Sequence, residues 1–435
     1  MISQTSYKKD KPKIKTKIDY GQNGLLIDTP KGAAIYTVRD RPAFQDEALA
    51  IQEALYNPIQ HNPIDELLKP GMRVLIVHSD ITRATPNDRL LPVILQEIIA
   101  HGVKREDITL LNGLGTHRLQ TRQELIKMLG ENIVSNYRCL QHDAYDQSQL
   151  VQIESPGLQR PVMVNRQLFE ADLIILTGFI EPHFFAGYSG GPKAILPALA
   201  GAETVFHNHN PAMVTHPNAT FNKTLGNPLW EEIKAAAECI ENTFLVNVTL
   251  DRNNRITGVF TGDVIAAHQS GCQFVRETSL FNISEPYDLV ITSNSGYPLD
   301  QNLYQCVKGM AAAKNAVRKG GCILMLAACE EGLPDQSAFA RWLKQAGSPQ
   351  GLQELISQPE FFGQDSWQVQ IQAQVQAHAD VFLYSDGLDE SQLKTSQLFQ
   401  CQNPNDTIPE LIKQYGPRTC VLPQGPLTIL ELTGC

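Results

Sequence analysis

The chain has 435 residues, of which 42% are hydrophobic and 19% are charged, and this length predicts two domains. Its 36 Lys and Arg residues against 46 Asp and Glu residues give a formal net charge of -10, which argues against a nucleic-acid partner because phosphate backbones require clustered basic side chains. The hydrophobic content argues against intrinsic disorder, and no apolar run approaches the roughly 18 to 20 residues of a membrane-spanning helix.

The amino-terminal segment and the cysteines both favour a cytoplasmic protein. Residues 1–19 carry several lysines, but no apolar segment follows them, so we expect no secretory signal. Residues 13–18 alternate with period two and predict an edge strand. The 9 cysteines are scattered and never spaced Cys-x-x-Cys, which is typical of a reducing compartment and gives no zinc-ribbon or iron–sulfur motif.

Strand and helix patterns alternate along the first half of the chain. Buried-type strands are predicted at 73–78, 107–111 and 171–177, and helices at 90–101 and 121–129. This alternation predicts βαβ units and a mostly parallel sheet, in which ligands bind beyond the carboxyl ends of the strands. Each predicted strand is followed by a loop rich in Gly, His, Asp or Arg, so the polar residues gather where a ligand should bind.

A second unit of the same kind is predicted from about residue 285. Its predicted elements are a helix at 301–319 and strands at 287–292, 322–326, 381–384 and 419–422. We therefore expect an α/β fold of two domains, 1–280 and 281–435, each with a mostly parallel sheet flanked by helices.

The loop at 78–86 offers a carboxylate, three hydroxyls and a guanidinium just past a predicted strand. Arg83 there is able to bind a carboxylate or a phosphate in bidentate fashion, with Asp80 beside it. The alternative is a local structural role, because Thr85 before Pro86 also suits the first positions of a helix.

The next loop, 112–118, begins as Gly-x-Gly after a strand, but Arg118 occupies the third glycine position of the dinucleotide-binding fingerprint. An acidic partner at the expected distance is also missing, because Asp143 lies too far along the chain. His117 is a residue type that suits acid–base catalysis and has an open approach on this loop, although an isolated loop histidine often has no such role.

The most unusual segment is 178–193, where glycines and prolines flank one His and one Lys. It does not match a phosphate-binding Walker A loop around Lys193. The aromatic Phe184 and Phe185 beside His183 predict a partly desolvated pocket, which favours use of a lysine as a nucleophile or covalent anchor. The alternative is a glycine-rich turn packed for steric reasons.

Two further segments carry candidate ligands. His207 and His209 are too divergent in direction to bind one metal together, so at most one is a ligand and the other supports it or packs. Tyr304, Gln305 and Lys308 share one face of the predicted helix in the second domain, as residues of a binding site or of a solvated surface.

Together these segments resemble the nickel-pincer lactate racemase family along essentially the whole chain. The residues that carry the resemblance are Ser79, Asp80, Thr82, Arg83, Gly115, Thr116, His117, Pro182, His183, Ala186, Gly187, Ser189, Gly190, Gly191, Lys193, His209, Tyr304, Gln305 and Lys308. The stretch from Pro182 to Lys193 is the most specific of them.

The resemblance implies a nickel-pincer nucleotide cofactor, pyridinium-3,5-bisthiocarboxylic acid mononucleotide nickel, made by cofactor-biosynthesis proteins. It implies that Lys193 holds this cofactor covalently and that His209 is the one protein ligand to nickel, because the cofactor supplies the other three positions. The remaining residues that it implies for cofactor binding are Asp80, Ser189, Gly190, Gly191 and Trp367.

The activity implied is racemisation or epimerisation of a small 2-hydroxy acid, lactate or malate first, in a cleft between the domains. His117 and His183 match the two acid–base catalysts of a reaction in which hydride moves reversibly between Cα and the cofactor. The residues implied for substrate binding are Arg83, Tyr304, Gln305 and Lys308.

Two alternatives belong to other classes. A nicotinamide-dependent 2-hydroxy acid dehydrogenase, with His117 as base, requires the dinucleotide fingerprint that Arg118 weakens. A metabolite-binding homologue without the cofactor would keep the fold and leave Lys193 unmodified, which the mass of the peptide containing Lys193 would reveal.

Overall fold

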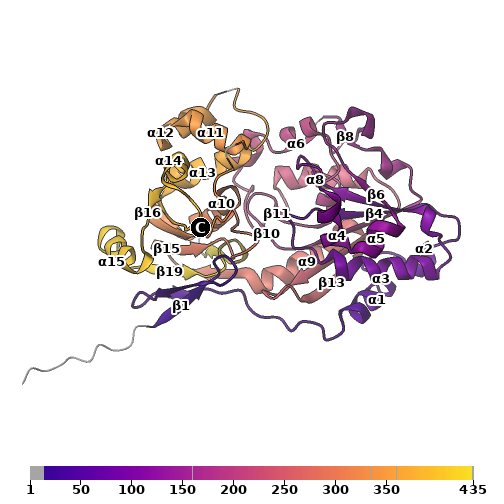
Figure 1. The fold of residues 1–435 in the computed structure, drawn as a ribbon, viewed down its shortest axis with the longest axis horizontal. Coiled ribbons are helices and arrows are strands. Elements are labelled where there is room, and N and C mark those ends of the chain that lie inside the picture. Colours follow the sequence, from indigo (N-terminus) through magenta and orange to yellow (C-terminus); the bar gives the residue numbers. More distant parts are fainter. Residues whose placement is uncertain (1–13, 159, 335, 359, 434–435) are drawn as a thin grey trace, which may run out of the picture. The chain divides into compact units, whose positions relative to one another are not determined.

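The computed structural model describes residues 14–158, 160–334, 336–358 and 360–433, which form two compact units (Figure 1). The larger unit comprises Val38–Leu280 and Ser337–Ala373. The smaller unit comprises Phe281–Gln336, the described residues up to Thr37 and those from Gln374 onward. Lys8, Lys9, Lys11 and Lys13, which entered the sequence prediction about secretion, lie outside the described residues.

Both units are discontinuous in sequence, unlike the continuous ranges expected. The amino-terminal residues join the smaller unit because β3 (Ala34–Ile35) pairs with β19 (Thr419–Leu422), and because the Tyr20 hydroxyl donates to Asp386 Oδ2 at 2.7 Å. Residues 337–373 join the larger unit partly because Gln370 Nε2 donates to the carbonyl of Pro211 at 3.0 Å.

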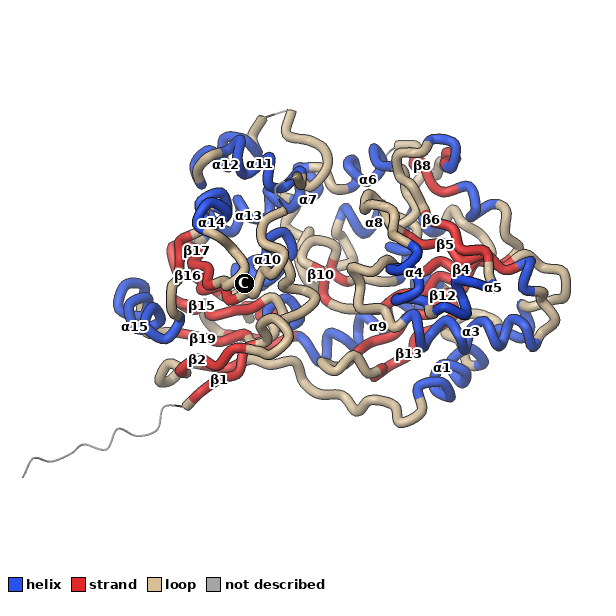
Figure 2. Tube along the Cα trace, in the orientation of Figure 1, coloured by secondary structure: helices blue, strands red, loops and turns tan. Residues whose placement is uncertain are grey.

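The larger unit contains a six-stranded sheet in the order β13-β12-β9-β4-β5-β6. All neighbouring strands are parallel except the edge strand β13, which is antiparallel to β12. The strands are β4 (Val74–Ser79), β5 (Ile108–Gly113), β6 (Arg138–Gln141), β9 (Leu173–Phe179), β12 (Thr243–Leu250) and β13 (Ile256–Gly262). The predicted parallel sheet is confirmed, and helices flank it (Figure 2).

Helices that lie wholly within this unit accompany the sheet. They are α1 (Glu47–Tyr56), α2 (Ile64–Leu67), α3 (Asn87–Ala100), α4 (Arg122–Leu129), α5 (Glu131–Asn136), α6 (Ala202–Asn208), α7 (Pro211–Val214), α8 (Pro228–Glu238), α9 (Val264–Ser279), α11 (Ala338–Ala346) and α12 (Pro349–Ile356). Helix α13 (Ser366–His378) runs from the larger unit into the smaller one. Short two-stranded pairs complete the unit: β7 (Leu150–Ile153) with β8 (Val162–Asn165), and β10 (Pro182–His183) with β11 (Gly187–Tyr188).

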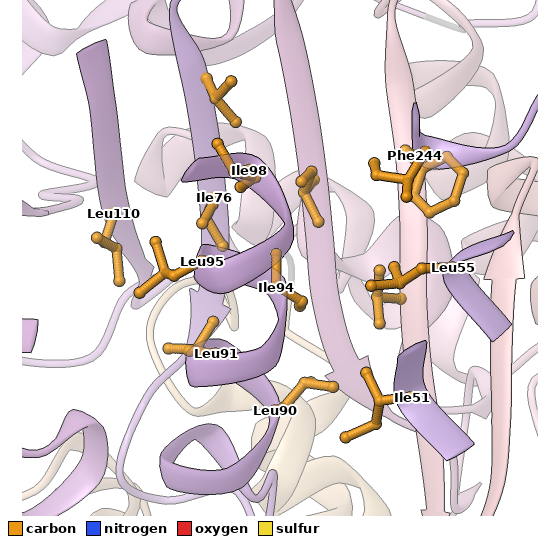
Figure 3. Close-up of a cluster of buried hydrophobic side chains, with 14 of the residues drawn as sticks. Ile51, Leu55, Ile76, Leu90, Leu91, Ile94, Leu95, Ile98, Leu110 and Phe244 are labelled. Atoms are coloured by element: carbon orange, nitrogen blue, oxygen red, sulfur yellow. The ribbon is translucent and has the colours of Figure 1, made fainter. Parts of the chain in front are cut away.

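Alternate residues of each central strand fill two separate cores. Ile76 of β4 faces the core formed with α1 and α3, whereas its neighbours Leu75 and Val77 face the opposite core. Figure 3 shows Leu91 and Ile94 of α3 directed at the strands beneath. This burial on both faces explains why the strands appear in the sequence as continuous apolar runs.

The smaller unit contains a second six-stranded sheet, in the order β18-β17-β16-β15-β19-β3 and parallel throughout. Its further elements are β15 (Tyr287–Ser293), α10 (Leu303–Lys314), β16 (Val317–Leu326), β17 (Asp380–Tyr384), α14 (Glu390–Ser396), β18 (Phe399–Gln400) and α15 (Pro404–Tyr415). Helix α10 ends earlier than the predicted residue 319, because Val317 already pairs with Tyr287. The hairpin of β1 (Lys15–Ile18) and β2 (Leu25–Asp28) contains the strand expected near the amino terminus, and β14 (Leu280–Ile283) pairs with β20 (Ile429–Leu432).

None of the helices in the described part of the chain is both long enough and apolar enough to cross a bilayer.

We expect the core between α3 and the sheet to dominate the stability of the larger unit. Leu91→Ala should lower the free energy of unfolding by about 2–5 kcal/mol, because Leu91 is fully buried and the substitution leaves a cavity. Leu225→Ala is the matched control, since Leu225 is 87% exposed. Denaturant unfolding of both variants checks this, and equal losses would contradict the assignment of the core.

Candidate functional site

The candidate site lies in the larger unit, beyond the carboxyl ends of three neighbouring parallel strands. The loops after β4, β5 and β9 carry Asp80, His117 and His183 respectively. The loop of His117 also packs against the segment that follows Lys193, because the Gly115 N–H donates to the carbonyl of Ala198 at 2.8 Å. The fold therefore gathers segments that are distant in sequence at one edge of the sheet.

Asp80 and His117 form a hydrogen-bonded pair at this edge. His117 Nδ1 donates to Asp80 Oδ2, while Asp80 Oδ1 accepts from the backbone N–H of Thr82 at 3.0 Å and from its hydroxyl at 2.6 Å. Burial alone would raise the pKa of Asp80, but attraction to His117 and its hydrogen bond, followed by Arg83 and Thr82, lower it to about 2. The ionised carboxylate fixes the His117 ring and leaves Nε2 as its free acceptor.

The same loop resolves the alternative noted for Thr85. Its hydroxyl accepts from Ser79 Oγ at 2.6 Å, whereas Pro86 occupies the position before α3 and no side chain caps that helix. The local capping role is therefore wrong. Arg83 is half-buried, and its backbone N–H donates to the carbonyl of Asp80 at 3.1 Å.

His183 lies on the short hairpin of β10 and β11 and is buried. Its Nδ1 accepts from the backbone N–H of Ala186 at 3.3 Å, so the proton of a neutral ring is on Nε2. The ring stacks on Phe184 and meets the edge of Phe185, at centroid distances of 5.0 and 4.6 Å. A side chain at Gly187, where φ is +78°, would collide with the carbonyl of Lys223, so this turn requires glycine.

Lys193 is the most unusual cation of the unit because it is 92% buried, with a relative exposure of 8%. It lies on the short 3-10 turn Gly191–Ala194, and its Nζ is 5.8 Å from the centre of the Phe185 ring. Phe185 thus contacts His183, Lys193 and His209. A desolvated amine against an aromatic ring is the environment expected of a covalent anchor.

His209 ends helix α6 and is held between two aromatic rings. Phe185 and Trp367 lie 5.0 and 5.1 Å from its ring centre. Burial, and then repulsion by Lys193, lower the pKa of His209 to about 3, so the imidazole is neutral. Its Nδ1 is buried and has no hydrogen-bond partner among the described residues.

This geometry fits a metal site in which His209 is the single imidazole ligand and other groups supply the remaining ligands. A neutral ring with an unpaired nitrogen is what metal coordination requires, and His207 lies elsewhere, against Phe362 at 5.1 Å. Among the described residues, no three His, Cys, Asp or Glu side chains are placed to hold a metal ion together. A cofactor held by Lys193 that supplies further ligands is compatible with that donor set.

Ser189, Gly190 and Gly191 form the turn that precedes Lys193. Ser189 Oγ accepts from the Glu181 N–H at 2.9 Å and donates to the carbonyl of Phe179 at 3.0 Å. Two buried residues that the sequence analysis missed also contact this turn, namely Asn247 and His268. Asn247 is a polar residue inside an apolar strand, and that irregularity was the available signal.

Tyr304, Gln305 and Lys308 lie on α10 of the smaller unit, where all three are half-buried. Asn302 caps this helix by accepting from the Gln305 N–H at 3.2 Å. The structure therefore gathers Asp80, Arg83 and His117 in one group and His183, Lys193, His209 and Trp367 in another, both within the larger unit. The three α10 residues form a separate group in the smaller unit.

Comparison with known proteins identifies relatives along the whole chain. A family model described as the lactate racemase N-terminal domain matches residues 20–222, and one described as the lactate racemase C-terminal domain matches residues 283–427. The lactate racemase of Thermoanaerobacterium thermosaccharolyticum is 32% identical over 95% of this chain and 99% of its own. The lactate racemase of Lactiplantibacillus plantarum is 35% identical over 79% of this chain and 81% of its own.

Solved structures agree with these matches. The lactate racemase apoprotein of Thermoanaerobacterium thermosaccharolyticum has a TM-score of 0.87 and 31% identity, and covers 96% of this chain and 100% of its own. A crystal structure from Thermotoga maritima, at 19% identity and a TM-score of 0.68 over 89% of this chain and 98% of its own, shows the fold alone.

We expect the larger unit to lose stability as the pH falls from about 6.5 to 4. Burial is the main cause that lowers the pKa of both His78 and His268 from 6.5 to about 4. In that window the unfolded chain binds protons that the folded chain excludes. This lowers the free energy of unfolding by on the order of 3 kcal/mol per histidine at pH 4. Denaturant unfolding at pH 7 and 4.5 should show a smaller loss for His78→Gln than for wild type.

The control is Leu91→Ala, which changes no titratable group and should lower the stability equally at both pH values. An unchanged pH dependence in His78→Gln would contradict the assignment.

Proposed function

We infer that this chain, which belongs to the lactate racemase family and is thus an isomerase, racemises a small 2-hydroxy acid of the lactate or malate kind. The observation that carries the proposal is that two imidazoles use Nδ1 in different ways. His117 donates through Nδ1 and keeps Nε2 as an acceptor, whereas His183 accepts through Nδ1 and keeps its proton on Nε2. One base and one acid are what inversion of a hydroxy acid demands.

The cofactor that we propose is the nickel-pincer nucleotide, which when bound supplies a reversible acceptor for the hydride of Cα. Lys193 would hold it covalently, and His209 would bind the nickel. Trp367 would cover it from the side of His209, whereas Ser189, Gly190 and Gly191 would contact it through the turn. Proteins that synthesise the cofactor are the maturation partners that this proposal requires.

The proposed work of the chain's own residues is proton transfer and substrate positioning. In one direction His117 Nε2 takes the hydroxyl proton, and the adjacent Asp80 carboxylate stabilises the imidazolium that forms. His183 returns a proton to the keto oxygen when the opposite enantiomer forms. Arg83 and Lys308 would bind the substrate carboxylate, while Tyr304 and Gln305 would contact its polar groups.

Polarimetry of the holoprotein tests this function. Single enantiomers of lactate, malate and related 2-hydroxy acids are supplied without nicotinamide, and we expect at least one to lose its optical rotation completely. His117→Ala and His183→Ala should each lower the rate by about 10²- to 10⁴-fold, the usual contribution of a general acid or base.

The control is the mass of the peptide containing Lys193, taken from the same preparation made alongside the maturation proteins. A modified lysine without rotation change on any substrate would refute the racemase proposal. An unmodified lysine would refute the covalent cofactor.

Asp80→Asn separates two roles for Asp80, contact with the cofactor and support of His117. We expect the rate of racemisation to fall by about 10²-fold or more, because His117 loses the carboxylate that orients it and stabilises its charged form. Occupancy of Lys193, measured by mass, should stay at the wild-type level. A parallel fall in occupancy would instead assign Asp80 to cofactor binding.

A further inference from the structure

The turn that carries Lys193 is held from two sides by buried side chains that have no role in the proton transfers. We propose that Asn247 and His268 are positioning residues that preset this turn, so that the Lys193 amine is held against the Phe185 ring before it becomes covalently attached. The inference rests on the proposed function for its purpose, and it concerns the backbone of residues 189–193.

Asn247 holds the turn from the sheet. It lies on β12, paired in register with Gly178 of β9, and is fully buried. Its Oδ1 accepts from the backbone N–H of Gly191 at 2.7 Å. A side chain at Gly190 would overlap that oxygen and the carbonyl of Phe179, so the turn packs directly on the strand. An acceptor in the middle of a buried strand has no use in the sheet itself, whose backbone is already paired.

His268 holds the turn from helix α9. It is fully buried, and its Nε2 donates to the carbonyl of Ser189 at 2.9 Å. The side chain packs directly against Gly191, where an added Cβ would overlap His268 carbon atoms. Cys272 Sγ lies 3.4 Å from the same Nε2 atom. Burial, and repulsion by Lys193, lower the pKa of His268 to about 4, which keeps the ring neutral with its proton available for Ser189.

The turn needs both restraints because two consecutive glycines form it. Gly190 and Gly191 have φ values of +75° and +57°, in the left-handed region that favours glycine. Such a pair is free to adopt several turns when nothing holds it. The bonds to Ser189 and Gly191 fix the peptide units on both sides of Gly190, and the direction of Lys193, two residues on, follows from them.

Hydrogen exchange tests the positioning without any cofactor. In Asn247→Leu and His268→Leu, the peptide spanning residues 187–195 should exchange its amides faster by on the order of tenfold, because each variant removes a buried hydrogen bond. His268→Gln keeps an N–H donor and should restore protection. His142→Leu is the matched control, because His142 is an equally buried histidine bonded to the carbonyl of Ala200 at 3.0 Å. It should lower the melting temperature and leave this peptide unchanged.

Covalent loading is the second readout. Holoproteins made alongside the maturation proteins should show Lys193 occupancy reduced about tenfold or more in both leucine variants, and near the wild-type level in His268→Gln and His142→Leu. Should a leucine variant not fold, Asn247→Thr and His268→Asn replace it, since these shorter polar side chains do not reach the turn and carry the same expected loss.

Folded leucine variants with wild-type exchange and wild-type occupancy would overturn the inference. Faster exchange with undiminished loading would also overturn it, because covalent attachment at Lys193 would then not depend on a restrained turn. An unmodified Lys193 in the wild type would count against the proposed cofactor alone, and the exchange measurement would still decide whether Asn247 and His268 hold the turn.

Discussion

The burial of the Lys193 amine is the constraint on which the rest of the larger unit's site depends. A cation that is only 8% exposed, against the ring of Phe185, has lost most of its hydration. Its charge also disfavours protonation of the nearby imidazoles, and contributes to the lowered pKa values of His209 and His268. This part of the site is therefore organised around one buried amine and neutral rings, which suits the covalent anchor and the metal ligand that we propose.

Delivering that amine requires an irregular backbone, and the parallel sheet supplies the support for it. After strand β9 the chain turns sharply through the β10–β11 hairpin and the glycine pair before η4 (Gly191–Ala194). Strand β12 beside β9 and helix α9 behind it are regular and well packed, and each contributes one polar side chain to the turn. The Lys193 turn is thus positioned by rigid secondary-structure elements, although the turn itself is irregular.

Whether a feature of the fold or of the site was predictable from the sequence depends on how far apart in the sequence its contacting residues lie. The strands and the polar loops after them were predictable because period and apolar runs are local in sequence. The roles of His117, His183, Lys193 and His209 follow from the family resemblance and stay predictions. The pairing of Asp80 with His117, and the contacts of Asn247 and His268 with the turn, join residues 37, 56 and 79 positions apart. No spacing rule covers such contacts, nor the pairing of β3 with β19 that gives the smaller unit its amino-terminal strand.

The negative net charge of the chain matters little to an anionic substrate, because charges beyond about 8–10 Å are largely screened in physiological salt. What matters is which charged groups lie next to one another within the site. Asp80 stays ionised down to a pH of about 2, and it is directed at His117 while Arg83 contributes an opposing positive charge. In the proposed mechanism the carboxylate can therefore orient His117 without repelling the substrate, because Arg83 places a positive charge close to it. In the proposed mechanism, an unpaired Asp80 would instead repel the anionic substrate.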